Sequence, residues 1–243
     1  MKTLPTRWLL LFLVVLLQSP KIHATDVPID ITGISDANYA GILPGFASGT
    51  QLLGGVTFDI PSGFPYFGTT YDQSVLSATL STNIANVEDV CLLLNTSDTY
   101  TSEMSVGDQI GEVTLTFASG SPEVVPLDVG VNIREWAIGT TAQPVINTFT
   151  SSSLQNVWTG DNNGGILSAI DMLTIPVSDL QTLTGITVAD DSAASIGQDN
   201  PGVLLRGVTV QAVPEPSANI LLVITAAILG GVFVKQKWAR CSC

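Results

Sequence analysis

Short runs of alternating apolar and polar residues dominate the middle of the chain. In residues 112–117, Val113, Leu115 and Phe117 alternate with polar positions, as in a strand that buries one face. Gly, Pro, Asn, Asp and Ser separate such runs, and no helical apolar period is sustained between the ends. The pattern therefore predicts an all-β domain. Its expected strands are 52–60, 75–80, 87–94, 110–117, 124–129, 133–138, 166–175, 183–188 and 203–210.

The spacing of these strands predicts how they pack. Residues 118–122 form a turn-rich segment between two strand-like runs, which indicates a hairpin. About nine strands in roughly 185 residues are typical of two sheets packed face to face. We therefore expect an antiparallel β-sandwich of the jelly-roll type.

The N-terminal end has a different pattern. Lys2 and Arg7 precede an apolar run at residues 8–17, which is followed by a short polar segment ending at Ala24. This order is typical of a signal peptide, and the apolar run is short for a membrane span. We expect residues 1–24 to be cleaved off, together with the single histidine, His23. An uncleaved membrane anchor is the alternative.

A second apolar segment, residues 218–234, lies near the C-terminus. Its seventeen uncharged residues would reach about 26 Å as a helix, close to the thickness of a bilayer core. The basic stretch 235–240 after it should remain cytoplasmic, which predicts that the domain at residues 25–212 lies outside the inner membrane. Two prolines in residues 213–217 keep the preceding backbone extended and accessible to a protease.

The last segment, residues 213–243, resembles the PEP-CTERM sorting signal. The resemblance rests on a Pro-Glu-Pro motif, an apolar helix and a basic end that follow one another at the chain terminus. It implies recognition by an exosortase, a membrane protease-transferase of Gram-negative bacteria that make exopolysaccharide. Two lysines in the basic end and the added Cys241 and Cys243 depart from the usual arginine-rich pattern, and a plain C-terminal anchor is the alternative. The implied motif residues are Val213, Pro214, Glu215 and Pro216.

Parts of the domain resemble galactose-binding-like jelly rolls of the discoidin and carbohydrate-binding type. The resemblance covers residues 53–60, the predicted hairpin, residues 132–136 and residues 205–210. It implies a sugar ligand, and sugars bind to exposed aromatic rings beside hydrogen-bonding side chains. Trp158 in a polar, Gly-rich segment meets this description, although a packing role for the ring is the alternative. The candidate ligand residues are Trp158, Asp161, Asn162 and Asn163.

The charge of the domain limits its partners. Residues 25–212 contain 20 Asp and Glu residues but only Arg134 and Arg206, which gives a formal net charge of −18. Such a domain repels nucleic acid and cannot dock on an anionic membrane through a polybasic patch. Asp190 and Asp191 are a candidate Ca²⁺ ligand pair, with a solvated turn as the alternative. We expect no other cofactor.

The sequence favours a function without catalysis. A mature chain without histidine cannot activate a nucleophile through imidazole, and Cys91 lies in an apolar run that indicates a buried thiol. A carboxylate pair is the remaining catalytic route, but no pair is singled out. We therefore expect an exported surface or extracellular-matrix protein, held at the inner membrane until its tail is processed, that binds or packs into extracellular polysaccharide. A ligand-free biofilm spacer and a carboxylate-dependent glycoside hydrolase are the alternatives.

Overall fold

The computed structural model describes residues 24–35, 37–38, 43, 45–63, 65–68, 76–97, 99, 104–139, 146–161, 167–190 and 202–215. These residues form strands and one short 3-10 helix, η1 (Ser178–Leu180), so the predicted all-β class is confirmed. The strands are β1 (Thr25–Ile29), β2 (Ala37–Asn38), β3 (Gly49–Leu53), β4 (Val56–Ile60), β5 (Pro65–Gly68), β6 (Ser77–Ile84), β7 (Val87–Ser97), β8 (Gln109–Phe117), β9 (Glu123–Asp128), β10 (Leu154–Asp161), β11 (Leu167–Pro176), β12 (Leu183–Asp190) and β13 (Gly202–Ala212).

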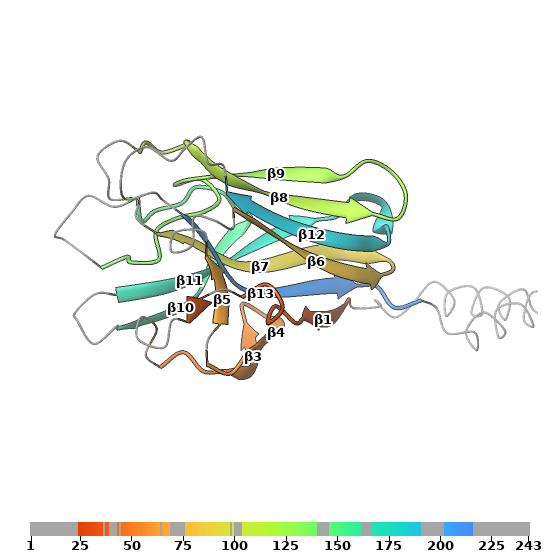
Figure 1. Cartoon of the computed structure of the whole chain (residues 1–243), viewed down its shortest axis with the longest axis horizontal. Helices are drawn as coiled ribbons and strands as arrows, with labels where there is room; N and C mark the ends of the chain where they lie inside the picture. The colour runs from red at the N-terminus through yellow and green to blue at the C-terminus, as the bar shows by residue number, and fades with distance from the viewer. Residues whose placement is uncertain are drawn as a thin grey trace, which may run out of the picture. The chain divides into compact units, whose positions relative to one another are not determined.

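Two antiparallel sheets lie face to face in a sandwich-like arrangement (Figure 1). The larger sheet has the order β10-β11-β7-β13-β5-β2, and β1 also pairs with β13. The smaller sheet has the order β6-β12-β8-β9. Strands that follow one another along the chain often belong to different sheets, as β6 and β7 do.

Apolar side chains from both sheets fill the space between them. On β8, Val113, Leu115 and Phe117 point into this core, as the alternation predicts, and the hairpin that joins β8 to β9 is confirmed. The larger sheet contributes side chains such as Leu92 on β7 and Leu173 on β11, which are 0% and 1% exposed. The inward faces of the two sheets therefore make one continuous core.

A second apolar cluster covers the outer face of the larger sheet. Phe58 on β4 is fully buried there and packs with a group that includes Cys91 and Leu93 of β7. The hairpin of β3 and β4 supplies most of this cover, so the prediction of one strand at 52–60 is wrong. The chain reverses at Gly54 and Gly55, whose φ angles of 60° and 89° suit a two-residue hairpin turn.

Two further expectations about strands are corrected by the structure. Residues 133–138 do not form a strand, because this segment makes only isolated bridges, including Thr96 with Glu135 and Ala137 with Ser168. In contrast, β10 was not among the expected strands. Its sequence contains several polar residues and a bulge between Asn156 and Trp158, and both features break the alternation that marks a strand.

The strands run from the expected start of the mature chain to the expected sorting motif. β1 begins at Thr25, directly after Ala24, and Thr25 pairs with Ala212, the last residue of β13. The chain divides into two units, Met1–Val213 and Pro214–Cys243. The predicted membrane segment at residues 218–234 and residues 1–23 lie outside the described part of the chain. Within the described part, no helix is long and apolar enough to cross a membrane.

Candidate functional site

A buried polar cluster around Asp171 is the most unusual chemical feature of the described domain. Asp171 lies on β11 and is 0% exposed. Arg134 makes two hydrogen bonds to its carboxylate, from Nε to Oδ2 and from Nη2 to Oδ1, both 2.7 Å long. The side-chain amides of Asn95 and Asn156 donate to the same two oxygens over 2.9 and 3.0 Å. Each carboxylate oxygen therefore accepts two hydrogen bonds.

Two β-bulges bring these side chains together. Asn156, Asp171, Leu94 and Leu205 lie in one row across β10, β11, β7 and β13. The pairing slips just beyond this row on both sides, after Asn156 on β10 and after Leu205 on β13. Arg206 is the extra residue of the second bulge. Bulges redirect side chains, and here Arg206 Nη1 donates to Asn95 Oδ1 over 2.9 Å.

The irregular segment at residues 133–138 completes the cluster. Arg134 reaches Asp171 from this segment, and its guanidinium lies 4.9 Å from the centre of the Phe149 ring. The next residue, Glu135, is also buried and accepts hydrogen bonds from the backbone N–H and the hydroxyl of Thr99, both 2.9 Å long. The segment thus supplies one buried cation and one buried anion to the end of the sandwich.

The two buried acids of this arrangement are held by hydrogen bonds from within the protein. Both oxygens of the Asp171 carboxylate accept two hydrogen bonds each, and Oε2 of Glu135 accepts two from Thr99. A glycosidase needs two carboxyl groups that face the scissile bond across a cleft. Asp171 does not fit this requirement, because donors within the protein occupy both of its oxygens.

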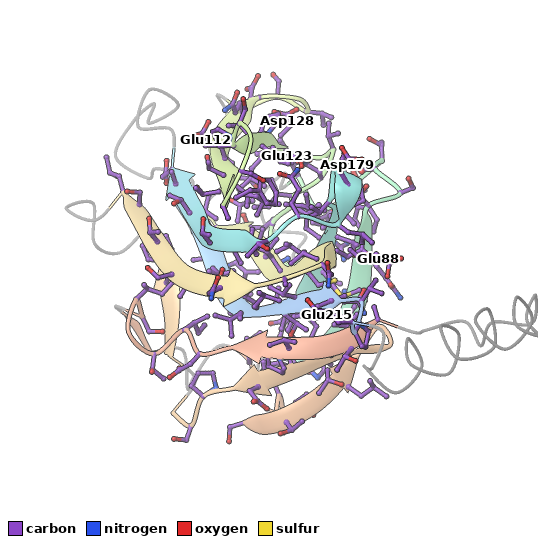
Figure 2. All side chains as sticks on the ribbon, turned by 90° about the vertical axis from the view of Figure 1, so that its right-hand side faces the viewer. Glu88, Glu112, Glu123, Asp128, Asp179 and Glu215 are labelled. Atoms are coloured by element: carbon purple, nitrogen blue, oxygen red, sulfur yellow. The ribbon has the colours of Figure 1, made fainter. Side chains whose placement is uncertain are left out.

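Burial of both arginines leaves an acidic exterior. Arg134 and Arg206 are 8% and 4% exposed, and they are the two basic residues of the domain. The exposed and half-exposed charged side chains of the described domain are therefore all acidic. Figure 2 shows three of them, Glu112, Glu123 and Asp128, over β8 and β9.

Trp158 packs against the second apolar cluster. Its ring is half-buried and makes an edge-to-face contact with Phe46, with 5.4 Å between ring centroids. The ring thus serves the outer-face cover, which is the packing alternative stated above. Asp161 is exposed at the end of β10, and Asn162 and Asn163 lie outside the described residues.

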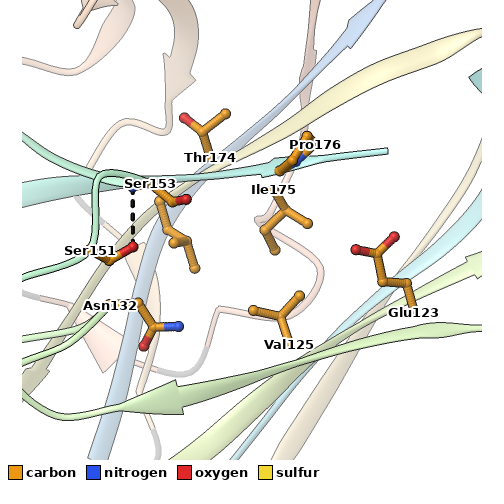
Figure 3. Close-up of a pocket in the computed structure, with 9 residues that line it drawn as sticks. Glu123, Val125, Asn132, Ser151, Ser153, Thr174, Ile175 and Pro176 are labelled. Carbon is orange, nitrogen blue, oxygen red and sulfur yellow. Dashed lines mark hydrogen bonds between the residues drawn. The ribbon is translucent and has the colours of Figure 1, made fainter. Parts of the chain in front are cut away.

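A small hollow lies between β9 of the smaller sheet and β11 of the larger sheet (Figure 3), and Trp158 is not among its lining residues. It measures about 140 Å³, below the ~300–1,000 Å³ typical of small-molecule sites. It has no aromatic lining residue, and Ser151 Oγ accepts a 3.1 Å hydrogen bond from the Ser153 backbone at its rim. The lining residues are Glu123, Val125, Asn132, Ser151, Ser153, Leu173, Thr174, Ile175 and Pro176.

The candidate metal ligands are only partly placed. Asp190 is the half-buried last residue of β12, and its backbone N–H donates to Leu76 O over 2.8 Å, while Asp191 lies outside the described residues. Among the described side chains, no group of three His, Cys, Asp or Glu residues could hold a metal ion. The suggested Ca²⁺ pair therefore stays a prediction.

Cys91 is buried beneath the β3–β4 hairpin, as its apolar run predicts. It is 0% exposed, and its Sγ lies 3.9 Å from the hydroxyl oxygen of Thr174. Burial raises the pKa of the thiol to about 12. The thiolate that nucleophilic chemistry requires is therefore strongly disfavoured.

The first residues of the sorting motif follow β13. Val213 still belongs to the domain, and its N–H donates to Asn86 O over 2.9 Å. Pro214 and Glu215 are exposed, and Pro216 lies outside the described residues. Comparison with known proteins adds no assignment, because no protein-family model matches the chain and no curated protein matches its sequence.

Sequence reasoning missed the Asp171 cluster, although two signals pointed to it. An aspartate stands inside the apolar run 166–175, where a charge needs a partner. Only two cations exist in the domain to supply that partner. The pairing with Arg134, 37 residues away, depends on the path of the chain and could not be inferred from either signal alone.

Proposed function

We propose that this protein is an exported, non-enzymatic component of the cell surface or extracellular matrix, sorted through Val213, Pro214, Glu215 and Pro216. The observation that carries the proposal is the exposure of Pro214 and Glu215 immediately after the last strand. Cleavage near them would leave the domain from β1 to β13 whole. Cleavage of the expected signal peptide after Ala24 would likewise fall before β1 and would interrupt none of the described strands.

The backbone chemistry of the motif supports its use by a protease. Val213 is tied to the domain by the hydrogen bond from its N–H to Asn86 O. Pro214 has no N–H to donate, and a proline restrains the residue before it to extended conformations. An exosortase-type enzyme would therefore meet extended, accessible backbone at Glu215.

A structural role in the matrix has more support than binding of a sugar at Trp158. The ring is engaged with Phe46, and the hollow between the sheets has no aromatic lining residue. An exterior of acidic charges favours dispersal outside the cell rather than docking on anionic surfaces. We therefore favour the spacer form of the proposal over the carbohydrate-binding and hydrolase forms.

We also propose that the two packed sheets form a jelly roll. Successive strands alternate between the two sheets, as from β6 to β7 and from β12 to β13. This alternation supports a jelly roll, because Greek-key connections carry the chain from one sheet to the other.

The test is expression in an exosortase-bearing host of the wild-type chain and of Glu215→Ala. Glu88→Ala is the matched control, because Glu88 is also an exposed glutamate but lies on β7. We expect released protein from the wild type and the control and retention of Glu215→Ala at the membrane. Equal release of all three chains would contradict the proposal, as would retention of all three.

A further inference from the structure

Strand β6 forms one edge of the smaller sheet and carries a repeating pattern of small polar side chains. It spans Ser77–Ile84 and pairs with β12 on one side. Among the described elements, no strand pairs with its other side. Its outward side chains are all exposed, while the alternate residues turn toward the core. The outward residues are Ser77, Thr79, Ser81 and Asn83.

The other long edge strands carry features that discourage pairing, and β6 does not. β9 contains Pro126 and two acidic residues, and β10 contains a bulge and ends in Asp161. Prolines, charges and bulges are the devices by which edge strands avoid adding to other chains. Among the described edges, β6 is an eight-residue strand with neither charge nor proline.

The absence of charge on β6 is unexpected in this domain. From Gln73 to Val87 the sequence contains no charged residue, although the domain as a whole carries a formal net charge of −18. Two copies of such a domain repel each other over most of their surfaces. Approach through β6 brings together two strands that carry no charge of their own, which limits this repulsion.

We propose that two copies of the chain pair through antiparallel β6 strands, so that their four-stranded sheets become one continuous sheet. Self-pairing of one edge is closed by a two-fold axis and gives a dimer rather than a fibre. Eight residues on each strand would contribute about eight backbone hydrogen bonds in an antiparallel ladder. The inference concerns the domain alone and does not depend on export or sorting.

The side chains of β6 favour a second copy over a different partner. The outward row offers hydroxyl and amide groups but no apolar or charged side chain that would select a complementary surface. An antiparallel self-pair places such short polar groups opposite each other, where Thr and Ser side chains form cross-strand hydrogen bonds. The same contact already exists within the sheet, where the hydroxyls of Thr79 and Thr187 lie 2.8 Å apart.

The test uses four substitutions in the full chain, solubilised in detergent. Ser81→Glu and Ser81→Lys each add a charge to the β6 edge, where the two strands would meet. Thr116→Glu and Thr116→Lys are the matched controls. Thr116 is exposed and lies in the same row of the sheet as Ser81, through Gly185, but two strands away, or about 10 Å.

Hydrogen exchange of the Ser77–Ile84 amides reports the pairing directly, separately from any association of the tails. We expect at least tenfold slower exchange at high than at low protein concentration in the wild type and both Thr116 variants. Protection should increase toward ~1 M salt, because the Debye length there falls to about 3 Å and the acidic domains repel each other less. Both Ser81 variants should lose the protection, even though Ser81→Lys lowers the net repulsion.

Two results would overturn the proposal. One is exchange of these amides that does not depend on protein or salt concentration. The other is protection that persists in both Ser81 variants, because a like charge on each of two paired β6 strands should oppose their pairing.

Discussion

Replacement of Asp171 by asparagine tests the buried polar cluster with almost no change in side-chain volume. The carboxylate accepts four hydrogen bonds, two of them from Arg134. Asparagine keeps one acceptor oxygen and turns an NH₂ group toward donors, so at least two of these bonds are lost. The charge of Arg134, which is 8% exposed, would then remain buried without its carboxylate.

Removal of one partner from a buried ion pair costs about 3–5 kcal/mol. Domains of this kind have free energies of unfolding of about 5–15 kcal/mol, so Asp171→Asn should remove a large part of the total. Urea denaturation followed by tryptophan fluorescence measures the loss as a lower midpoint at unchanged slope. Asp161→Asn is the matched control, because Asp161 is exposed at the end of β10, and its free energy of unfolding should change by less than about 0.5 kcal/mol.

The double variant Asp171→Asn with Arg134→Met distinguishes an unpaired charge from lost packing. Removal of both charges should cost less than the sum of the two single substitutions, by about 2 kcal/mol or more. A loss below about 1 kcal/mol for Asp171→Asn, or additive single effects, would refute the assignment of Asp171 and Arg134 as an interdependent pair.

Two further predictions concern titratable groups on the larger sheet. Burial, and then the charge of Glu88, raises the pKa of Asp89 above 3.8. Ionisation of this carboxyl group therefore destabilises the fold increasingly as the pH rises from 3.8 through the raised pKa. Asp89→Asn should therefore raise the free energy of unfolding at neutral pH by about 0.5 kcal/mol or less, and the gain should vanish as the pH falls toward 3.8. The control is Asp30→Asn, which should give no gain in stability at neutral pH, because a hydrogen bond from the Thr32 backbone lowers the pKa of Asp30. Equal gains in the free energy of unfolding from the two substitutions would contradict the predicted destabilisation by Asp89. Cys91 should resist labelling by maleimide in the native chain and react after unfolding. The mass of the chain measures the labelling, in a variant with Cys241→Ser and Cys243→Ser so that Cys91 is the thiol that reacts. Rapid labelling of the native chain would show that the β3–β4 hairpin does not protect Cys91.

The parts of the fold that could be predicted from sequence are those with regular alternation. In β8, apolar residues at every second position lie on one face, and the polar turn at residues 118–122 closes the hairpin with β9 as expected. The β3–β4 hairpin was missed because Gly54 and Gly55 interrupt a run that otherwise looks like one long strand. Both glycines have positive φ, and consecutive glycines between strand-like runs are a known hairpin signal.

The polar cluster could not be predicted because its members become neighbours only through tertiary structure. Asn95, Arg134 and Asp171 come from three separate segments, and bulges on β10 and β13 set the final geometry. The sequence around Trp158 is polar and Gly-rich, which favours an exposed ring. Its ring instead packs on Phe46, 112 residues earlier, which no local pattern could reveal.

The intact mass of the protein released from an exosortase-bearing host shows where the chain has been cut, and so tests sorting through the Pro-Glu-Pro motif. We expect a chain that starts at Thr25 and ends between Pro214 and Pro216, with any attached group read from the excess mass. An intact chain that keeps its tail to Cys243 and stays in the membrane fraction would contradict sorting through this motif.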